Sequence, residues 1–280
     1  MSLRSLLFVP ADRPDRFAKA AASGADALIL DLEDSVALDR KGAGRTAVAE
    51  WLAQDRGAPA FVRVNPLKSD HISADLAAIL PGRPDGLVLP KAEGASSIRA
   101  VLDLCGGDCP PILPIATETP AAIFQLGSYV EVADRLAGLT WGAEDLPAAI
   151  GAATSREEDG RYTPPYEMAR SLTLFAAHAA GVPAIETVFP RIDAPDNLAA
   201  YVARARRDGF AAMMAIHPAQ VPIINAGFTP TEAEVAHARA VIDAFAAQPG
   251  AGALKLDGRM IDRPHLVQAQ RIVALAARSR

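Results

Sequence analysis

The sequence has few of the features that mark secreted, membrane or nucleic-acid-binding proteins. Its two cysteines, Cys105 and Cys109, are too few for a disulfide framework and lack the partners of a zinc site, so we expect both to be reduced. No apolar run approaches the roughly 18 residues of a membrane span, and the first one is too short for a signal peptide. With 28 basic residues against 33 acidic ones, the net charge of −5 favours neither nucleic acid nor anionic membranes as partners. These absences predict a cytoplasmic protein.

Aromatic residues are also scarce at 5%, but half of the residues are hydrophobic and only 22% are charged, so the chain can bury a large core. Eight short apolar runs are each followed by a longer segment with helical spacing. The apolar runs are residues 6–10, 27–32, 60–64, 87–90, 112–116, 137–141, 184–189 and 212–216. The helical segments are residues 14–22, 40–54, 72–80, 95–104, 120–132, 166–180, 194–207 and 231–247.

Eight such repeats predict an α/β fold, the (β/α)8 or TIM barrel, whose parallel strands are buried on both faces. An open, doubly wound sheet is the competitor, but no Gly-x-Gly-x-x-Gly motif or P-loop follows any strand. We expect the barrel to be the catalytic domain and to occupy residues 1–247. Residues 248–280 are a C-terminal extension with a glycine-rich hinge, a turn at Asp257-Gly258 and a closing helix. This extension either docks on its own barrel or reaches a neighbouring subunit.

Charged residues follow most of the predicted strands, at the end of the barrel where active sites form. Carboxylates brought together in this way repel unless a proton or a cation neutralises them. Oxygen ligands without cysteine suit Mg²⁺, with Mn²⁺ as an alternative, and two protein carboxylates would suffice. The strand-end residues include Asp31, Glu33, Asp34, Arg63, Asn65, Lys91, Glu93, Glu118, Glu144, Asp145, Glu186 and His217.

The three basic residues in this set, Arg63, Lys91 and His217, each allow two interpretations. Arg63 either clamps a substrate carboxylate or forms an ion pair with Asp31 or Glu33 across the barrel rim. Lys91 is surrounded by carboxylates, which should keep its pKa high, so we expect an electrostatic or structural role and not a Schiff base. His217 is either a base or ligand, or a hydrogen-bonded turn residue before Pro218.

Several of these segments resemble the HpcH/HpaI aldolase and citrate lyase β-subunit family. The motifs that carry the resemblance are residues 4–10 (RSLLFVP), 30–36 (LDLEDSV), 62–65 (VRVN), 89–91 (LPK), 118–119 (ET), 142–146 (GAEDL) and 216–218 (IHP). The resemblance implies a barrel that assembles as a homotrimer or hexamer. It also implies a Mg²⁺-dependent lyase that cleaves or forms a CoA thioester such as citryl-CoA, citramalyl-CoA or malyl-CoA, with a 2-oxoacid as the other partner.

The resemblance also implies roles for individual residues. Glu118 and Asp145 match the family's two metal ligands, and Arg63 matches its substrate-binding arginine. The tail at residues 258–264 is similar to that of the citramalyl-CoA and malyl-CoA lyase branch, in which the aspartate matching Asp262 acts as acid or base in a neighbour's site. The remaining matches are Glu33 and Asp34 around the metal, and Phe8 and Lys19 at the CoA moiety.

Alternatives stay open for the acids and for the activity. Glu118 and Asp145 could be solvated or ion-paired rim acids, and Asp262 could cap the helix that begins near Pro264. The activity could be that of a metal-dependent pyruvate-type aldolase that does not use CoA. The chain could also be a non-catalytic subunit or scaffold.

Overall fold

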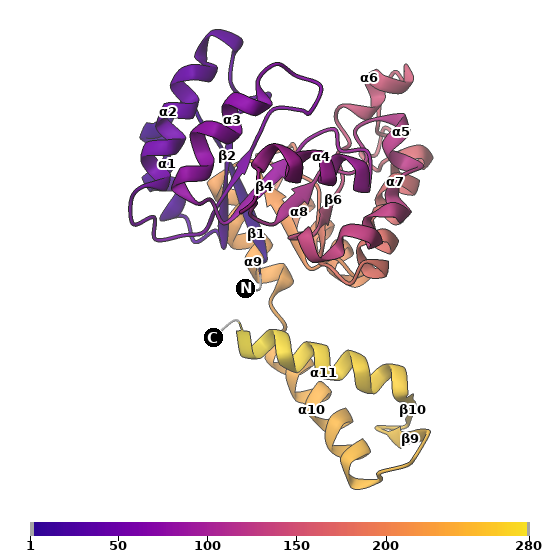
Figure 1. Cartoon of the computed structure of the whole chain (residues 1–280). Helices are drawn as coiled ribbons and strands as arrows, with labels where there is room; N and C mark the ends of the chain where they lie inside the picture. The colour runs from indigo at the N-terminus through magenta and orange to yellow at the C-terminus, as the bar shows by residue number, and fades with distance from the viewer. Residues whose placement is uncertain (1–2, 279–280) are drawn as a thin grey trace. The chain divides into compact units, whose positions relative to one another are not determined.

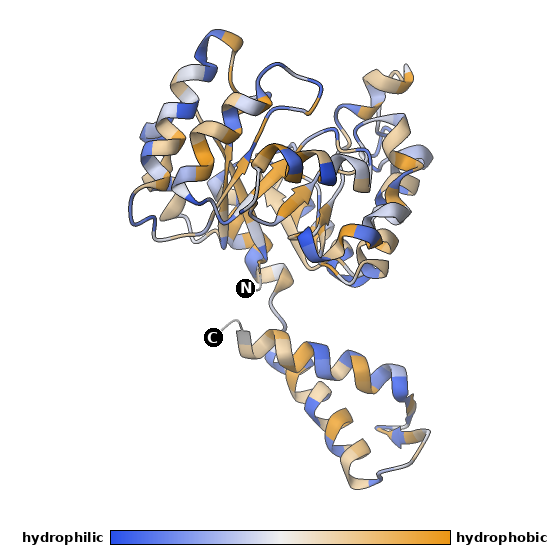
Figure 2. Cartoon of the chain, in the orientation of Figure 1, coloured by the Kyte–Doolittle hydropathy of each residue, from blue (hydrophilic) through white to orange (hydrophobic). Residues whose placement is uncertain are grey.

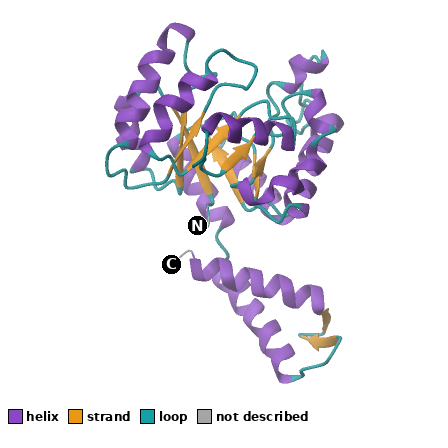
Figure 3. Cartoon of the chain, viewed as in Figure 1, coloured by secondary structure: helices purple, strands orange, loops and turns teal. Residues whose placement is uncertain are grey.

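The computed structural model describes residues 3–278, which divide into two compact units, residues 3–225 and residues 226–278. The first unit holds eight strands that form one parallel sheet in the order β5-β4-β3-β2-β1-β8-β7-β6. Figure 3 shows these strands in orange at the centre of the unit, with helices around them. The strands are β1 (Ser5–Pro10), β2 (Ala27–Asp31), β3 (Ala60–Arg63), β4 (Gly86–Leu89), β5 (Ile112–Pro114), β6 (Leu139–Thr140), β7 (Ala184–Glu186) and β8 (Ala212–Ala215).

The sheet closes on itself between β5 and β6. Parallel bridges join Ile112 to Leu136 and Ile115 to Thr140. The amide of Ala116 also donates to the carbonyl of Thr140 at 2.8 Å. The predicted (β/α)8 barrel is therefore confirmed, with each strand in the expected apolar run.

The strands read as apolar runs because both of their faces are covered. Every residue of β2 and of β4 is buried, and the helices lie around the outside of the strands (Figure 1). The interior is filled by one apolar cluster, and the strands form the hydrophobic centre of the unit (Figure 2). This interior cluster comprises Leu6, Ala27, Ile29, Phe61, Val88, Leu113, Ile115, Ile185, Ala212 and Met214, with Leu3, Phe8, Ala137 and Val188 packed against it.

The helices after the strands follow the sequence prediction, apart from a short additional helix at Leu146–Ile150 and two further exceptions. They are α1 (Phe17–Ala21), α2 (Lys41–Leu52), α3 (Ile72–Ile79), α4 (Ala95–Cys105), α5 (Pro120–Ile123), α6 (Leu146–Ile150), α7 (Pro164–Ala179), α8 (Pro195–Asp208) and α9 (Val221–Phe228). Short 3-10 segments are η1 (Pro14–Arg16), η2 (Leu38–Arg40), η3 (Leu80–Gly82), η4 (Leu126–Arg135) and η5 (Pro218–Gln220).

The first exception is the helix predicted over residues 120–132, which is wrong in this form. The α-helix stops after Ile123, and the 3-10 segment η4 follows from Leu126. The hydroxyl of Ser128 donates to the carbonyl of Gln125 at 2.7 Å, a local bond that competes with helical hydrogen bonding. Gly127 further weakens the helix, because glycine has the most backbone entropy to lose.

The second exception is the helix after β8. Residues 231–247 do form a helix, α10 (Glu232–Ala247), but α9 precedes it directly after β8 and η5. The division between the compact units falls between Asn225 and Ala226, inside α9. Residues 231–247 therefore belong to the second unit and not to the barrel, contrary to their expected place as its eighth helix.

The second unit is a helical hairpin with its own small core. It contains α10, the antiparallel strands β9 (Ala253–Leu256) and β10 (Arg259–Asp262), and α11 (Arg263–Arg278). Asp257 and Gly258 connect the strands with φ angles of 49° and 79°, the positive values of the predicted tight turn. The core of the unit comprises Ala238, Val241, Phe245, Ile261 and Ala269.

No helix within residues 3–278 is both long and apolar enough to cross a membrane. The two cysteines are free thiols near the C-terminal end of α4, as predicted. The participation of residues 248–280 in a neighbouring subunit stays a prediction.

Candidate functional site

A cavity of about 330 Å³ lies where the barrel strands end. Residues at or just after β1, β2, β3, β5, β6, β7 and β8 contribute to its wall. Because all eight strands are parallel, their carboxyl ends meet at this one face of the barrel. Of the predicted site residues, Phe8, Asp34, Arg63, Glu118 and Asp145 line the cavity.

The guanidinium of Arg63 is held by two carboxylates. Its Nε and Nη2 each donate to one oxygen of Asp31 at 2.6 Å, and its Nη1 lies 3.0 Å from Oε2 of Glu33. The guanidinium also stacks on the ring of Phe8, with 4.9 Å between its central carbon and the ring centroid. The ion pair with Asp31 and Glu33, one of the two predicted interpretations, is therefore present. Two of the five N–H donors form hydrogen bonds, both with Asp31, so donors remain for a ligand.

Burial and pairing pull the pKa values of this cluster in opposite directions. Burial acts to raise the pKa of the Asp31 carboxyl, but the hydrogen bonds from Arg63 outweigh it and keep that pKa below its ordinary value. Burial acts to lower the pKa of Arg63, yet the Asp31 carboxylate keeps it above its ordinary value. Burial raises the pKa of Glu33, with Arg63 opposing the shift. Arg63 thus stays charged and fixed in orientation.

Lys91 links three of the acids around the cavity. Its ammonium Nζ lies 2.7 Å from Oε1 of Glu33 and 3.7 Å from Oδ1 of Asp145. Its backbone has a φ of 52°, in the left-handed region, and its amide donates to Oε2 of Glu118 at 2.5 Å. Burial acts to lower the pKa of Lys91, but the hydrogen bond to Glu33 raises it above its ordinary value. Such a lysine is a poor nucleophile at neutral pH, as the sequence analysis expected.

Glu118 is a buried carboxylate without a basic partner. Only 4% of the residue is exposed, and within residues 3–278 no lysine or arginine forms an ion pair with it. Burial raises the pKa of Glu118 to about 8, and the nearby charges of Asp145 and Glu33 add to this shift against the opposing amide of Lys91. A carboxyl in this state needs either a proton or a cation at neutral pH.

The backbone beside Glu118 is shaped for close approach. A Cβ atom on Gly142 would lie 2.7 Å from Cγ of Glu118, so no larger residue fits at position 142 without a shift. Thr117 holds this segment in place, because its hydroxyl donates to the carbonyl of Gly142 and accepts from its amide. Asp145 follows at the start of α6, but its side chain does not cap that helix. Its carboxylate therefore remains available to the cavity.

A buried polar network, which the sequence analysis missed, supports the loop that carries Glu33. The ammonium of Lys41 donates to the carbonyls of Leu32 and Glu33 and to Oδ1 of Asn65, at 2.7 to 2.8 Å. Asn65 in turn donates to Asp75 at 2.7 Å. Burial lowers the pKa of Lys41. Of the side chains in this network, only that of Asn65 was a candidate from the sequence, because it lies at the end of a predicted strand.

Two predicted residues in the first unit lie away from the cavity. Lys19 is exposed on α1, and His217 is exposed at the start of η5; neither is among the described residues that line the cavity. The Nδ1 atom of His217 accepts from the amide of Ala219 at 3.2 Å. His217 therefore has the turn role that the sequence analysis offered as one of its two interpretations. The CoA contact expected of Lys19 stays a prediction.

Asp262 lies in the second unit, at the end of β10 and just before α11. Its carboxylate lies 2.5 Å from Nδ1 of His265, one turn into the helix, and 38% of the side chain is exposed. This contact joins two side chains and is not a helix cap, and the amide of Asp262 donates to the same Nδ1 atom at 3.2 Å. It leaves part of the carboxylate accessible, so the predicted acid or base role stays a prediction.

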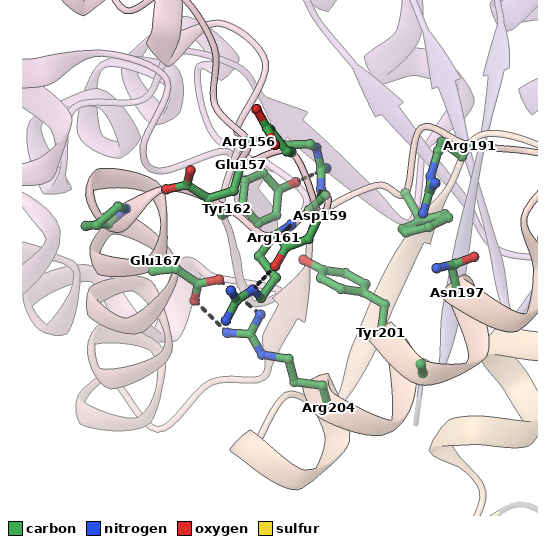
Figure 4. A pocket seen from close by; sticks show the side chains of 15 residues that line it. Arg156, Glu157, Asp159, Arg161, Tyr162, Glu167, Arg191, Asn197, Tyr201 and Arg204 are labelled. Carbon is green, nitrogen blue, oxygen red and sulfur yellow. Dashed lines mark hydrogen bonds and ion pairs between the residues drawn. The ribbon is translucent and has the colours of Figure 1, made fainter.

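A second and larger cavity, of about 1190 Å³, lies between the segment of residues 156–162, α7 and α8 (Figure 4). Several of its charged side chains are paired: Arg161 with Asp159, Arg204 with Glu167, and Arg156 with the hydroxyl of Tyr162. Within residues 3–278 the two cavities share no lining residue. The contacts of Arg161 and Arg156 lie within the long connection after β6, whereas Arg204 and Glu167 join α8 to α7.

The donor set of the first cavity suits a hard divalent cation. No group of three or more His, Cys, Asp or Glu side chains is arranged to hold a metal ion in the described part of the chain. Mg²⁺, however, commonly takes one or two carboxylates and completes its octahedron with water and substrate oxygens. Glu118, without a basic partner, and Asp145 on the same cavity wall fit that pattern.

Comparisons with known proteins agree with this picture. The family model described as HpcH/HpaI aldolase/citrate lyase matches residues 4–218. A citrate lyase subunit beta-like protein of Mycobacterium tuberculosis is 36% identical over 271 residues, which cover 96% of this chain and 94% of the relative. A (3S)-malyl-CoA thioesterase of Cereibacter sphaeroides is 33% identical over 279 residues, covering 98% and 94%.

Solved structures give the same result. The crystal structure of CitE from Mycobacterium tuberculosis in complex with magnesium, acetoacetate and coenzyme A matches with a TM-score of 0.84 and 35% identity, covering 98% of this chain and 97% of that one. Another CitE structure from the same organism, in complex with magnesium and pyruvate, matches with a TM-score of 0.75 and 33% identity, covering 97% and 99%.

Proposed function

We propose that this chain, which belongs to the HpcH/HpaI aldolase/citrate lyase family, is a Mg²⁺-dependent carbon–carbon lyase. Its substrate would be a CoA thioester of a 3-hydroxy-carboxylic acid, of the citryl-CoA, citramalyl-CoA or malyl-CoA type. The products would be a 2-oxoacid and an acyl-CoA, or the reverse in the synthetic direction. The observation that carries the proposal is Glu118, a buried carboxylate that has no basic partner among residues 3–278, on a cavity that Asp145 and Arg63 also line.

Glu118 and Asp145 would hold the Mg²⁺ ion, or Mn²⁺ in its place. The bound ion would supply Lewis acidity to the hydroxyl and the adjacent carboxylate of the substrate. Lys91 would keep both ligands in position, since its amide binds Glu118 and its ammonium lies near Asp145. The acidic residues Glu33 and Asp34 would order the water molecules around the ion.

Cleavage breaks the bond between C2 and C3 of the thioester. The hydroxyl on C3 gives its proton to a base and becomes the carbonyl of the 2-oxoacid, while the bonding electrons pass to C2 and form the thioester enolate. A proton then adds to C2 and gives the acyl-CoA. The free N–H donors of Arg63 would orient the substrate carboxylate, and Asp31 and Glu33 fix that guanidinium beforehand.

The remaining predicted roles complete the proposal. Phe8 and Lys19 would contact the CoA moiety. Asp262 would exchange a proton with the substrate in the site of a neighbouring subunit, so that the working enzyme would be a homotrimer or hexamer. The partial exposure of the Asp262 carboxylate supports this role.

The test is a cleavage assay with three purified thioesters, malyl-CoA, citramalyl-CoA and citryl-CoA, each with Mg²⁺ and with EDTA. We expect metal-dependent release of a 2-oxoacid from at least one of them. Asp145→Asn should lower kcat/KM by roughly 100-fold or more, whereas Glu158→Gln, an exposed acid at the second cavity, should retain full activity. Metal-independent activity, or none with any thioester, would contradict the proposal.

Calorimetry separates this activity from that of a pyruvate-type aldolase without CoA. Titration of the intact protein with CoA should release or absorb heat if the proposal is correct. An aldolase that acts on free hydroxy-oxoacids should show no such binding.

A further inference from the structure

The first cavity has two chemically different parts. Its rim carries the carboxylates described above. Its floor consists of Phe8, Ile115, Val188 and Met214, which line the cavity and at the same time belong to the apolar cluster inside the barrel. The floor is therefore the top layer of the hydrophobic core. It offers no charge to a ligand.

The basic side chains at this cavity already form ion pairs with acidic side chains. Of the residues that line it within residues 3–278, five are acidic and Arg63 alone is basic. Two N–H groups of Arg63 donate to Asp31 and its Nη1 lies beside Glu33, so the donors that remain can bind one substrate carboxylate. Lys91 is paired with Glu33 and lies near Asp145. A second substrate carboxylate would thus meet an excess of negative charge or an apolar floor.

The tetrahedral geometry of the substrate's carbinol carbon directs one of its four substituents towards this floor. If the proposed function holds, the carbinol carbon places its hydroxyl and its carboxylate at the acidic rim and at Arg63, and its thioester arm leads out to CoA. These three groups leave the fourth substituent of a tetrahedral carbon pointing away from the rim. The apolar side chains on the cavity wall that such a substituent would meet include Val188 and Met214. The sulfur of Met214 is itself held 3.9 Å from the hydroxyl of Thr140.

We infer that the cavity selects thioesters in which this fourth substituent is a small uncharged alkyl group, and that Val188 and Met214 determine this selectivity. The inference rests on the proposed lyase function and narrows its substrate class. A methyl group gains contact with the floor, whereas a carboxymethyl group has to bury an uncompensated charge there.

Three thioesters form a matched series for the test, because they differ only in the fourth substituent of the carbinol carbon. Malyl-CoA carries hydrogen, citramalyl-CoA carries methyl and citryl-CoA carries carboxymethyl. We expect kcat/KM for citramalyl-CoA to exceed that for malyl-CoA by about 10-fold, the usual effect of one buried methyl group. It should exceed that for citryl-CoA by on the order of 100-fold or more, because the second carboxylate lacks a partner.

A cation introduced at the floor should reverse part of this preference. Val188 is only partly buried, so Val188→Lys should fold, and we expect it to raise kcat/KM for citryl-CoA at least tenfold relative to citramalyl-CoA. Val188→Met is the matched control, of similar length without charge, and should keep the wild-type preference. Met214→Lys tests the same effect from β8.

The outcomes separate the two proposals. Equal or faster cleavage of citryl-CoA by the wild-type enzyme would overturn the selectivity but leave the lyase function intact. An unchanged preference in both folded lysine variants would overturn the assignment of Val188 and Met214. Absence of metal-dependent cleavage of all three thioesters would instead overturn the proposed function, and the selectivity with it.

Discussion

Replacement of Glu118 by glutamine should stabilise the metal-free protein at alkaline pH. The folded protein raises the pKa of this carboxyl from an ordinary value of 4.5 to about 8, chiefly through burial. A carboxyl whose pKa is raised on folding contributes its full stability below the ordinary pKa and loses it as pH rises through the folded value. Wild-type protein in EDTA should therefore lose stability between about pH 4.5 and about pH 8.

The size of the effect follows from the shift. Each pKa unit corresponds to about 1.4 kcal/mol, so the ceiling on the loss is roughly 4 to 5 kcal/mol above pH 8. Glu118→Gln resembles the protonated carboxyl in shape and can still accept the hydrogen bond from the amide of Lys91. It should abolish this pH dependence, so that the variant exceeds the wild type by about 2 kcal/mol or more at alkaline pH.

Urea unfolding in EDTA at about pH 5 and at about pH 8.5 measures the effect. At the lower pH the two proteins should unfold at similar urea concentrations, and at the higher pH the variant should unfold later. Millimolar Mg²⁺ should raise the midpoint of the wild type much more than that of Glu118→Gln, because the variant keeps only one of the two carboxylate ligands, Asp145. Glu158→Gln should behave as the wild type in both media. Equal pH dependence in wild type and Glu118→Gln would refute the reasoning about burial, and equal stabilisation by Mg²⁺ would refute the metal assignment.

Three further substitutions test other parts of the site. Arg63→Lys should lower kcat/KM by on the order of 100-fold in the thioester assay, because a lysine cannot bind Asp31 in two hydrogen bonds and still orient a carboxylate; near-normal kinetics would argue against the clamp. Lys41→Met should lower the free energy of unfolding by about 3 kcal/mol, measured in urea, because it leaves buried acceptors unpaired; a loss under about 1 kcal/mol would contradict the network. Gly142→Ala should weaken Mg²⁺ binding in calorimetry about tenfold or more, because its Cβ displaces Glu118, and unchanged binding would exclude that contact as a constraint.

Much of the barrel was predictable because each parallel strand, buried on both faces, leaves a continuous apolar run in the sequence. The helices were harder to predict where individual serine, glycine or proline residues determine whether a helix forms or continues. Ser128 and Gly127 break the segment predicted as one helix, and α9 is short and has a proline at its second position, so its pattern is weak. The sequence also placed α10 after β8 correctly, but only packing shows that it belongs to the second unit.

The sequence predicted which side chains lie at the site, but it did not predict which of them form pairs. Strand-end positions correctly brought Arg63, Glu118 and Asp145 to one cavity. Both interpretations of Arg63 were open because partner choice depends on side-chain rotamers, which residue order does not determine. Lys41 left no signal at all, since a lysine in a helical segment is usually exposed and only the packing of α2 buries it.

Because the backbone of Lys91 lies in the left-handed region, the contributions of its main chain and of its side chain can be varied independently. Its main chain steadies one acid, Glu118, while its side chain neutralises another, Glu33. Glycine adopts this conformation without strain, so Lys91→Gly would retain the amide donor and remove the side chain with its ammonium. A single position therefore allows the electrostatics of the pocket to be redesigned without disturbing the scaffold that supports it.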